Sequence, residues 1–453
     1  MPHAYVIIFI MTVITAILAN IIPAGTFDRV EDASGNSVVV ADSFHHVDKI
    51  GCSIFDMFKS FQIGFEDSAQ IIFFIIFAYA FVYVLLKNGT FDALVGSVLR
   101  KVGNRIELII PVCMILFGLL GSTMGMFEET YGLIPVFISI AMALGYDAIV
   151  GGSVIYLGVA VGFAAATINP FTIGIAQEVA GVKMFSGLGY RILCFVVFMG
   201  ISIWYVWRYA RRIQKDPTKS YLYGEKIETL ECASREEMME IKMTTTHKLS
   251  CLLFVFTIGM LLYGTIKLGW YIDEIATLFI IMTIVSGLVS RFTPSEIADI
   301  FIEASKEMMY GALLVGISRS IAVIMENAQI IDTVVYWLAT MLQHFRGMAS
   351  AMGMLFAQNI INFFIPSGAG QALITMPILA PVGEMVGVSR QFSVLAYQFG
   401  DGFSNIFWPT SVFMMCGIMR LPINKWYRFV TPLFLIIFAA SIVLLGAAVV
   451  IGY

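Results

Sequence analysis

The sequence predicts an all-α membrane protein that crosses the bilayer many times. Of its 453 residues, 59% are hydrophobic and only 13% are charged, and the mean hydropathy is +0.87. Apolar runs of about 20 residues, the length of a membrane-spanning helix, recur from end to end. These runs lack the two-residue alternation of barrel strands, so we expect helices, which satisfy their backbone polar groups internally.

Composition also argues against several classes of function. The net charge is −4 without a basic block, so nothing indicates nucleic-acid binding. The six cysteines lie far apart without zinc spacing, and we expect neither a disulfide framework, a metal site nor a cofactor. The motifs H-E-x-x-H and G-x-S-x-G are absent. Glu128 and Glu129 resemble the start of the E-E-x-x-x-R pattern of membrane-embedded proteases, but position 133 is Leu, so we predict no enzyme.

Nine segments have the length and apolar character of full spans. The first lacks a basic start and a cleavage site, so we expect a retained span. Proline after Asn169 and after Trp408 removes a helix hydrogen bond and interrupts two of the nine. Four amphipathic segments, 53–66, 91–103, 293–305 and 330–344, are expected to lie on the membrane surfaces. The spans are 4–24, 69–87, 150–184 (interrupted), 188–208, 248–267, 272–290, 309–326, 391–421 (interrupted) and 429–452.

Two further apolar segments, 106–145 and 347–388, are predicted to be re-entrant hairpins. Each has two arms around a small or polar centre, GSTMGMFEETYG in the first and IPSGAGQ in the second. The arms Ile106–Gly121 and Tyr131–Gly145 are shorter than the roughly 20 residues that a span needs, so the tips should stop near mid-membrane. The alternative is that Glu128 and Glu129 lie in an external loop between two short spans.

Basic residues indicate the orientation. With a cytoplasmic amino terminus, the inner segments hold 18 of the 27 Lys and Arg residues, among them Lys87, Arg100, Lys101 and Arg105. The acidic segment 25–67 then falls outside. The long polar connector 209–247 falls inside and separates the two halves of the chain, 1–208 and 248–453.

The two halves show weak internal similarity. At an offset of 240 residues Asp92 coincides with Asp332, and at 242 Pro135 coincides with Pro377. Five full spans lie between equivalent points, an odd number. We therefore predict two inverted-topology repeats, each with one hairpin and one interrupted helix, as in secondary transporters with a site at the repeat interface.

The tips and the interrupted helices supply the candidate binding residues. Broken helices expose N–H and C=O groups at mid-depth, where these groups can replace the water around a solute. Single hydroxyls here can instead bond back to their own helix. The predicted substrate-binding residues are Glu128, Glu129, Thr130, Thr167, Asn169, Ser367, Gly368, Gly370, Gln371, Asp401, Ser404, Asn405 and Thr410.

Two intramembrane charges need separate explanations. Asp401 is predicted to be functional, because a carboxylate inside a membrane is costly to keep. Arg319 could bind a substrate carboxylate or pair with a carboxylate such as Glu326. We favour the structural pair, because the repeat partner of Arg319 is Tyr79, outside the hairpins and broken helices.

Four stretches, FEETYGLIP, INPFTIGIAQ, IPSGAGQALITMPI and QFGDGFSNIFWPTS, resemble the YfcC family of the C4-dicarboxylate anaerobic carrier (DcuC-like) group, within the ion transporter superfamily. The resemblance covers nearly the whole chain. It implies a dimerising scaffold domain and a transport domain that moves by an elevator mechanism. Relatives bind anions with Ser-Asn-Thr motifs at both tips; this chain has Glu-Glu-Thr at 128–130 and Ser-Gly-Ala-Gly-Gln at 367–371. Some YfcC-like members resemble arginine/ornithine exchangers.

Electrostatics distinguishes the possible substrates. Two carboxylates and Asp401 near one mid-membrane site would repel a dianion and attract a guanidinium or ammonium group. We therefore expect an antiporter of cationic amino acids, arginine against ornithine, working as a homodimer in the bacterial cytoplasmic (inner) membrane. The main alternative is a proton- or sodium-coupled carrier of C4-dicarboxylates or other organic anions. A channel does not fit inverted repeats with closed hairpin tips.

Overall fold

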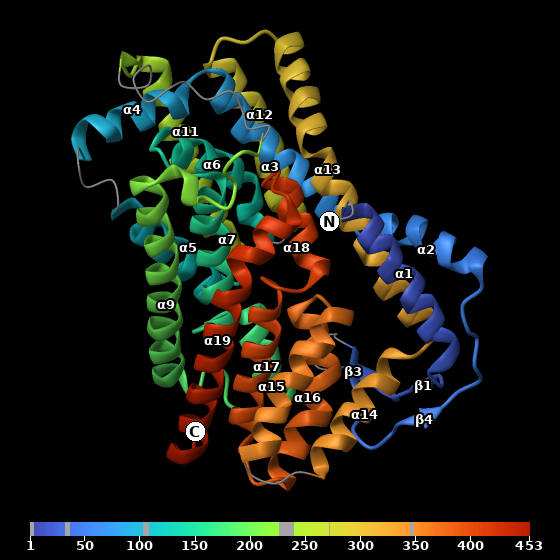
Figure 1. The fold of residues 1–453 in the computed structure, drawn as a ribbon. Helices are drawn as coiled ribbons and strands as arrows, with labels where there is room; N and C mark the ends of the chain where they lie inside the picture. The colour runs from blue at the N-terminus through green and yellow to red at the C-terminus, as the bar shows by residue number, and fades with distance from the viewer. Residues whose placement is uncertain (1–3, 32–36, 103–107, 226–239, 271, 345–347) are drawn as a thin grey trace.

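The computed structural model describes residues 4–31, 37–102, 108–225, 240–270, 272–344 and 348–453 (Figure 1). Several sequence predictions extend beyond these ranges. Arg105, residues 106 and 107 of the first predicted hairpin, residue 347 of the second, and 226–239 of the predicted connector lie outside the described residues.

The amino-terminal half contains a hairpin, a broken helix and a long helix in that order (Figure 1). The hairpin packs against the broken helix that follows it, and that helix packs against the long one. The elements are α1 (Ala4–Ile21), α2 (Ile54–Asp67), α3 (Ala69–Lys87), α4 (Thr90–Val102), the hairpin α5 (Ile109–Met124), η2 (Glu128–Leu133) and α6 (Ile134–Ala143), the broken helix α7 (Ala148–Ala165), η3 (Pro170–Gly174) and α8 (Ile175–Val179), α9 (Leu188–Lys215) and the short turn η4 (Pro217–Lys219).

The carboxyl-terminal half repeats this order of hairpin, broken helix and long helix. The two broken helices contact each other through α7 and α17. The elements are α11 (Thr245–Tyr263), η5 (Gly264–Leu268), α12 (Ile272–Val289), α13 (Pro294–Asn327), α14 (Ile331–Gln343), the hairpin α15 (Met348–Phe364) and α16 (Gly368–Met385), the broken helix α17 (Arg390–Ser404) and α18 (Pro409–Ile418), and α19 (Ile423–Ile451).

The predicted spans correspond to helices of differing length. Within the described ranges, five helices are long and apolar enough to cross a membrane: α3, α7 with α8, α9, α12 and α19. The bent helix α13 brings the number to six if it is taken as one span. Helices α1, α11 and α18 and the hairpin helices α5 and α15 are apolar but shorter. The chain is therefore a multi-pass membrane protein, and the inverted relation of its halves stays a prediction.

Helix α13 differs from the prediction of a surface helix at 293–305 followed by a span at 309–326. It is one continuous helix with a bend of 42° between Tyr310 and Ala312. Glu307, which lies between the two predicted segments, has partners in the structure: it accepts a hydrogen bond from Tyr79 (2.7 Å) and pairs with Arg420 (3.2 Å). Because these charges are compensated, the helix continues through them.

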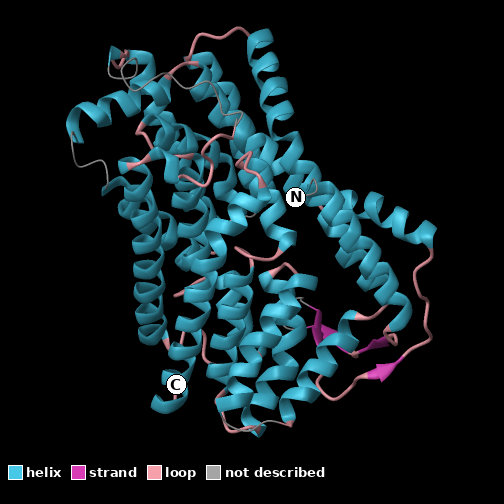
Figure 2. Cartoon of the chain, in the orientation of Figure 1, coloured by secondary structure: helices cyan, strands magenta, loops and turns pink. Residues whose placement is uncertain are grey.

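The acidic segment before α2 departs from the all-α prediction. It forms two small antiparallel sheets, in which β1 (Gly25–Thr26) pairs with β4 (His45–His46) and β2 (Arg29–Glu31) pairs with β3 (Ser37–Val39). These strands lie together beside α14 and α16 (Figure 2). They are only two or three residues long, too short to produce a detectable alternation.

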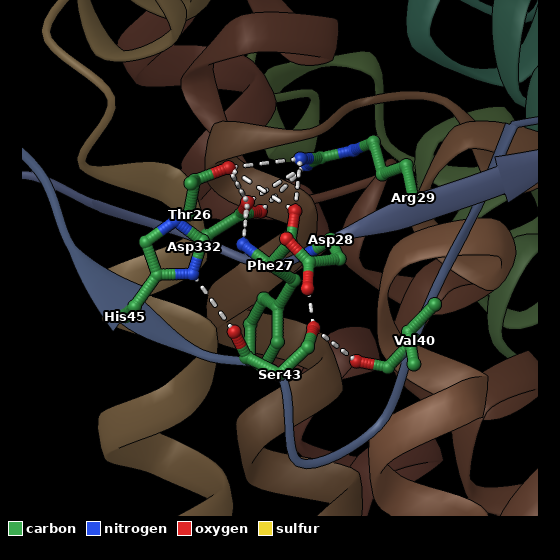
Figure 3. A network of polar contacts seen from close by, with 8 residues as sticks. All are labelled: Thr26, Phe27, Asp28, Arg29, Val40, Ser43, His45 and Asp332. Atoms are coloured by element: carbon green, nitrogen blue, oxygen red, sulfur yellow. Dashed lines mark hydrogen bonds and ion pairs between the residues drawn. The ribbon is translucent and has the colours of Figure 1, made fainter.

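One buried carboxylate attaches these strands to the helices. Figure 3 shows Asp332 of α14 facing Thr26, Phe27 and Arg29. Arg29 Nη2 donates to both Asp332 oxygens (2.9 and 2.8 Å), and the Phe27 amide donates to Asp332 Oδ2 (3.1 Å). Asp332 is 5% exposed, whereas the Arg29 side chain is 37% exposed, so the buried carboxylate is bound in a bidentate pair by a cation that reaches the surface.

Glycines allow the first hairpin to approach the broken helix closely. A Cβ on Gly162 of α7 would lie 1.9 Å from the Gly118 carbonyl oxygen of α5, and one on Gly121 would lie 2.5 Å from the Val159 carbonyl oxygen. Small residues at such contacts let helix backbones pack tightly where no hydrophobic effect drives association. The position of the hairpin therefore depends on these two glycines.

Local capping sets where helices start. Ser53 and Asp56 form a capping box at the start of α2, and Thr293 and Glu296 form another at the start of α13. Hydrogen bonds from Ser53 hold the pKa of Asp56 below its usual value. Both helices thus begin at polar residues that satisfy their free N–H groups.

Gly162→Ala is expected to lower thermal stability, because the added methyl group collides with backbone atoms that cannot rotate away. Overpacking of this kind costs roughly 1–3 kcal/mol. Thermal unfolding of the purified protein measures the effect. Gly200→Ala on α9 is the control, since nothing lies within 4 Å of its added Cβ; equal melting temperatures for the two variants would contradict the packing described.

Asp332→Asn is expected to loosen the two small sheets, since the amide loses the charge that Arg29 neutralises. We expect a loss of about 1–3 kcal/mol. Proteolysis rates in segment 25–46 and the melting temperature measure it. Asp48→Asn, at an exposed position of the segment before α2, should leave both unchanged; an equal effect of the two substitutions would refute the role of Asp332.

Candidate functional site

Both hairpin tips open into one cavity of about 560 Å³. The size lies within the range of small-molecule sites. Its walls come from the first tip, the second tip, the break between α17 and α18, and the flanking helices α2 and α13. Of the predicted residues, the cavity is lined by Glu128, Glu129, Ser367, Gly368, Gly370, Asn405 and Thr410.

The first tip is a tight turn that places two carboxylates in the cavity. Helix α5 ends where Gly125 adopts a left-handed conformation (φ 69°), and the 3₁₀ turn η2 begins at Glu128. Glu129 Oε2 accepts a hydrogen bond from the Phe127 amide (2.8 Å) and so fixes the turn. No other residue in the described part of the chain donates to Glu128. Glu128 is therefore the carboxylate that remains available to a solute.

The second tip presents the start of a helix to the same cavity. Ser367 caps α16, with its hydroxyl accepting from the Gly370 amide (3.3 Å). The amides of Gly368 and Ala369 belong to the first turn, where N–H groups have no partner within the helix. These N–H groups and the helix dipole favour a negative group.

The break between α17 and α18 adds neutral polar groups. Asn405 donates to the Asp401 carbonyl (3.0 Å), and Ser411 donates to Asn405 Oδ1 (3.3 Å). The Thr410 hydroxyl is buried without a partner among the described residues. A ligand that contacts Thr410 would satisfy this hydroxyl.

Six predicted site residues hold the structure around the cavity but do not line it. Thr130 donates to the Phe127 carbonyl (2.8 Å), Ser404 donates to the Asp401 carbonyl (2.7 Å), and Gln371 donates to Gln358. The six are Thr130, Thr167, Asn169, Gln371, Asp401 and Ser404.

The first broken helix is closed against the first hairpin. The hydroxyls of Ser122 and Thr167 lie 2.9 Å apart, and the Thr167 and Ile168 amides donate to Ser122. Asn169 caps η3 through the Phe171 amide (2.9 Å). Thr167 and Asn169 thus satisfy the groups freed by the break.

Arg191 supports the first helix break but was not among the residues predicted from the sequence. Its guanidinium is fully buried and donates to the Thr167 carbonyl through Nη2 (3.0 Å) and to Tyr453 Oη (3.2 Å). A cation beside the carboxyl end of α7 is favoured by the helix dipole. Because Arg191 lies near the start of the predicted span 188–208, the sequence alone does not distinguish it from an arginine at the membrane surface.

More carboxylates than cations line the cavity among the described residues. The carboxylates are Asp67, Glu128, Glu129 and Glu326, and the one cation of the described lining is Arg319. Arg319 pairs with Glu326 (3.1 Å), as predicted, and also with Asp67 (3.4 Å). Two carboxylates of the first tip are then left without a countercharge, so the cavity favours a cation.

A multi-pass protein with a polar cavity between two helix breaks has the construction of a membrane transporter, and comparison with known proteins supports this class. The family model described as C4-dicarboxylate anaerobic carrier (DcuC) matches residues 1–450. The chain belongs to this family. It is 31% identical to the Escherichia coli K12 protein named "Putative basic amino acid antiporter YfcC", covering 100% of this chain and 97% of that protein.

Further similarity is weaker. An uncharacterized protein of Haemophilus influenzae is 27% identical, with 87% of this chain and 78% of that protein covered. Among solved structures, the Alcanivorax borkumensis YdaH transporter (TM-score 0.43, 16% identity, 100% and 99% of the two chains) and Neisseria gonorrhoeae MtrF (TM-score 0.41, 18% identity, 98% and 94%) are similar.

Arg191→Gln is expected to destabilise the break after α7, because the Thr167 carbonyl loses its charged donor in a dry environment. The loss should be roughly 2 kcal/mol. The melting temperature of the purified protein measures it. Arg212→Gln, at an exposed position of the same helix, is the control; a melting temperature of Arg191→Gln equal to that of the control would show that the buried guanidinium is not needed.

Proposed function

We propose that this protein is a secondary active antiporter of cationic amino acids that exchanges arginine for ornithine across the bacterial cytoplasmic membrane. The observation that carries the proposal is the charge of the cavity: Glu128 faces it without a protein partner, and the one lining cation of the described residues, Arg319, is paired twice. A relative at 31% identity bears the name of a basic amino acid antiporter, which agrees with this charge.

The proposed binding mode uses opposite charges in one cavity. Glu128 receives the guanidinium or side-chain ammonium, while Glu129 keeps the tip in shape through the Phe127 amide. The α-carboxylate lies at the amino-terminal end of α16, near the amides of Gly368 and Ala369, with Asn405 and Thr410 as neutral donors. A zwitterion with an added cation matches this combination, and a dianion does not.

The proposed transport cycle follows from the repeated order of elements. Each half supplies one hairpin and one broken helix to the cavity region, and we propose that they form inverted repeats that move together as a transport domain. The remaining helices would form a scaffold that dimerises. The elevator movement carries the occupied cavity from one side of the membrane to the other.

A carrier of dicarboxylates is the second candidate, because the family model is described by that substrate class. The amino-terminal ends of α16 and α18 could bind a carboxylate in either case. The two candidates differ at Glu128, which would repel the second carboxylate of a dianion.

Glu128→Gln is expected to weaken arginine binding roughly 10- to 100-fold, because a charge-assisted hydrogen bond is replaced by a neutral one. Glu129→Gln should be milder, since the amide oxygen can still accept from Phe127. The measurement is uptake of labelled arginine into proteoliposomes loaded with ornithine.

The matched control is Glu384→Gln, which removes an exposed surface carboxylate paired with Arg390. It should exchange arginine like the unaltered protein. Uptake of succinate that arginine does not inhibit, with no arginine exchange, would reject the proposed function and favour the dicarboxylate carrier.

A further inference from the structure

A buried carboxyl group lies directly behind the second hairpin tip. Asp401 of α17 is 0% exposed, and its Oδ2 lies 3.2 Å from the point where a Cβ on Gly368 would stand. Gly368 itself lines the cavity. Asp401 Oδ2 and the cavity are therefore both in contact with the same glycine, beside the side chains of Thr172 and Phe163.

One oxygen of this carboxyl group accepts a hydrogen bond and the other does not. Asp401 Oδ1 accepts from Asn362 Nδ2 at 2.7 Å. Asp401 Oδ2 and Asn362 Oδ1 are both buried and have no partner among the described residues. Both atoms are acceptors when Asp401 is ionised, so neither can satisfy the other, and buried oxygens left in this state are costly. Asp401 and Asn362 therefore lack one donor hydrogen between these two oxygens.

Within the part of the chain that the structure describes, no cation pairs with an ionised Asp401. The charged or titratable groups that interact with it are Glu128 of the first tip and Tyr397 on its own helix, whose hydroxyl donates to the Gly368 carbonyl (2.6 Å). Two cations on α17 and α19 pair with other carboxylates: Arg390 with Glu384 and Lys425 with Glu225. The other titratable groups on helices packed against α17 are Tyr156 on α7, Glu178 on α8, and Tyr427 and Arg428 on α19.

We propose that Asp401 is a proton-binding site linked to the cavity. A proton from cavity water forms an O–H bond at Asp401 Oδ2, and the carboxyl group changes from charge −1 to neutral. The acid then has a hydrogen for the unsatisfied Asn362 Oδ1, while Asn362 Nδ2 still donates to Asp401 Oδ1. Release returns the proton to cavity water and restores the carboxylate.

The proton site implies coupling to the solute. In the proposed binding mode the α-carboxylate lies at the Gly368 amide, directly in front of Asp401. An ionised Asp401 repels this carboxylate, whereas the neutral acid does not. Proton and solute therefore bind cooperatively, each strengthening the other by the same factor. This coupling rests on the proposed function; the proton site itself does not.

Infrared difference spectroscopy of the purified protein in lipid tests the proton site directly. At neutral pH we expect a carboxylic-acid C=O band that shifts in D2O. It should be lost in Asp401→Asn, whose amide can keep a hydrogen bond to Asn362, and retained in the surface control Glu384→Gln. A band that survives in a folded Asp401→Asn protein would overturn the proposal, as would binding of ²²Na⁺ that this substitution abolishes.

Arginine–ornithine exchange in the same preparations separates this proposal from the proposed function. If arginine is not exchanged but the Asp401 band is present, the proton site holds and the proposed function fails. If arginine is exchanged, its affinity should rise as the pH falls through the range in which Asp401 takes up its proton, and it should change much less in Asp401→Asn. An identical pH dependence in both proteins would overturn the coupling.

Discussion

The constraint on which the structure depends is that every backbone polar group released from a helix inside a membrane must find another partner. The break after α7 meets it through Ser122, Thr167 and the buried guanidinium of Arg191. The break after α17 meets it through side chains of its own turn, Ser404 and Asn405. Both breaks also keep polar atoms at the cavity, Thr172 from the first and Asn405 and Thr410 from the second.

The same constraint explains why one tip of the cavity attracts an anionic group and the other a cationic group. At the second tip the first amides of α16 have no helical partner and attract an anionic group. At the first tip Glu129 binds the Phe127 amide, so the turn is stabilised without a ligand and Glu128 is left free. Both glutamates line the cavity, and Glu129 also stabilises the turn of the tip.

Much of this arrangement could be predicted from the sequence, because glycine, proline and charge within apolar runs are unusual enough to mark breaks. The helices around 69–87 and 188–208, both tips and both broken helices lie where these signals placed them. Partners distant in sequence could not be predicted. Glu307 lies between the predicted segments 293–305 and 309–326, yet Tyr79 and Arg420 compensate its charge and α13 continues. The short strands near Arg29 depend likewise on Asp332, about 300 residues away.

The proposed function requires that a cationic amino acid binds between the two tips, with its cation at Glu128. A cryo-electron-microscopy structure of the protein with arginine would test this binding mode. Density is expected in the cavity between the η2 turn and the start of α16, with the guanidinium at Glu128 and the carboxylate at the Gly368 and Ala369 amides. An empty cavity at saturating arginine, or a bound dicarboxylate in its place, would contradict the proposed binding mode.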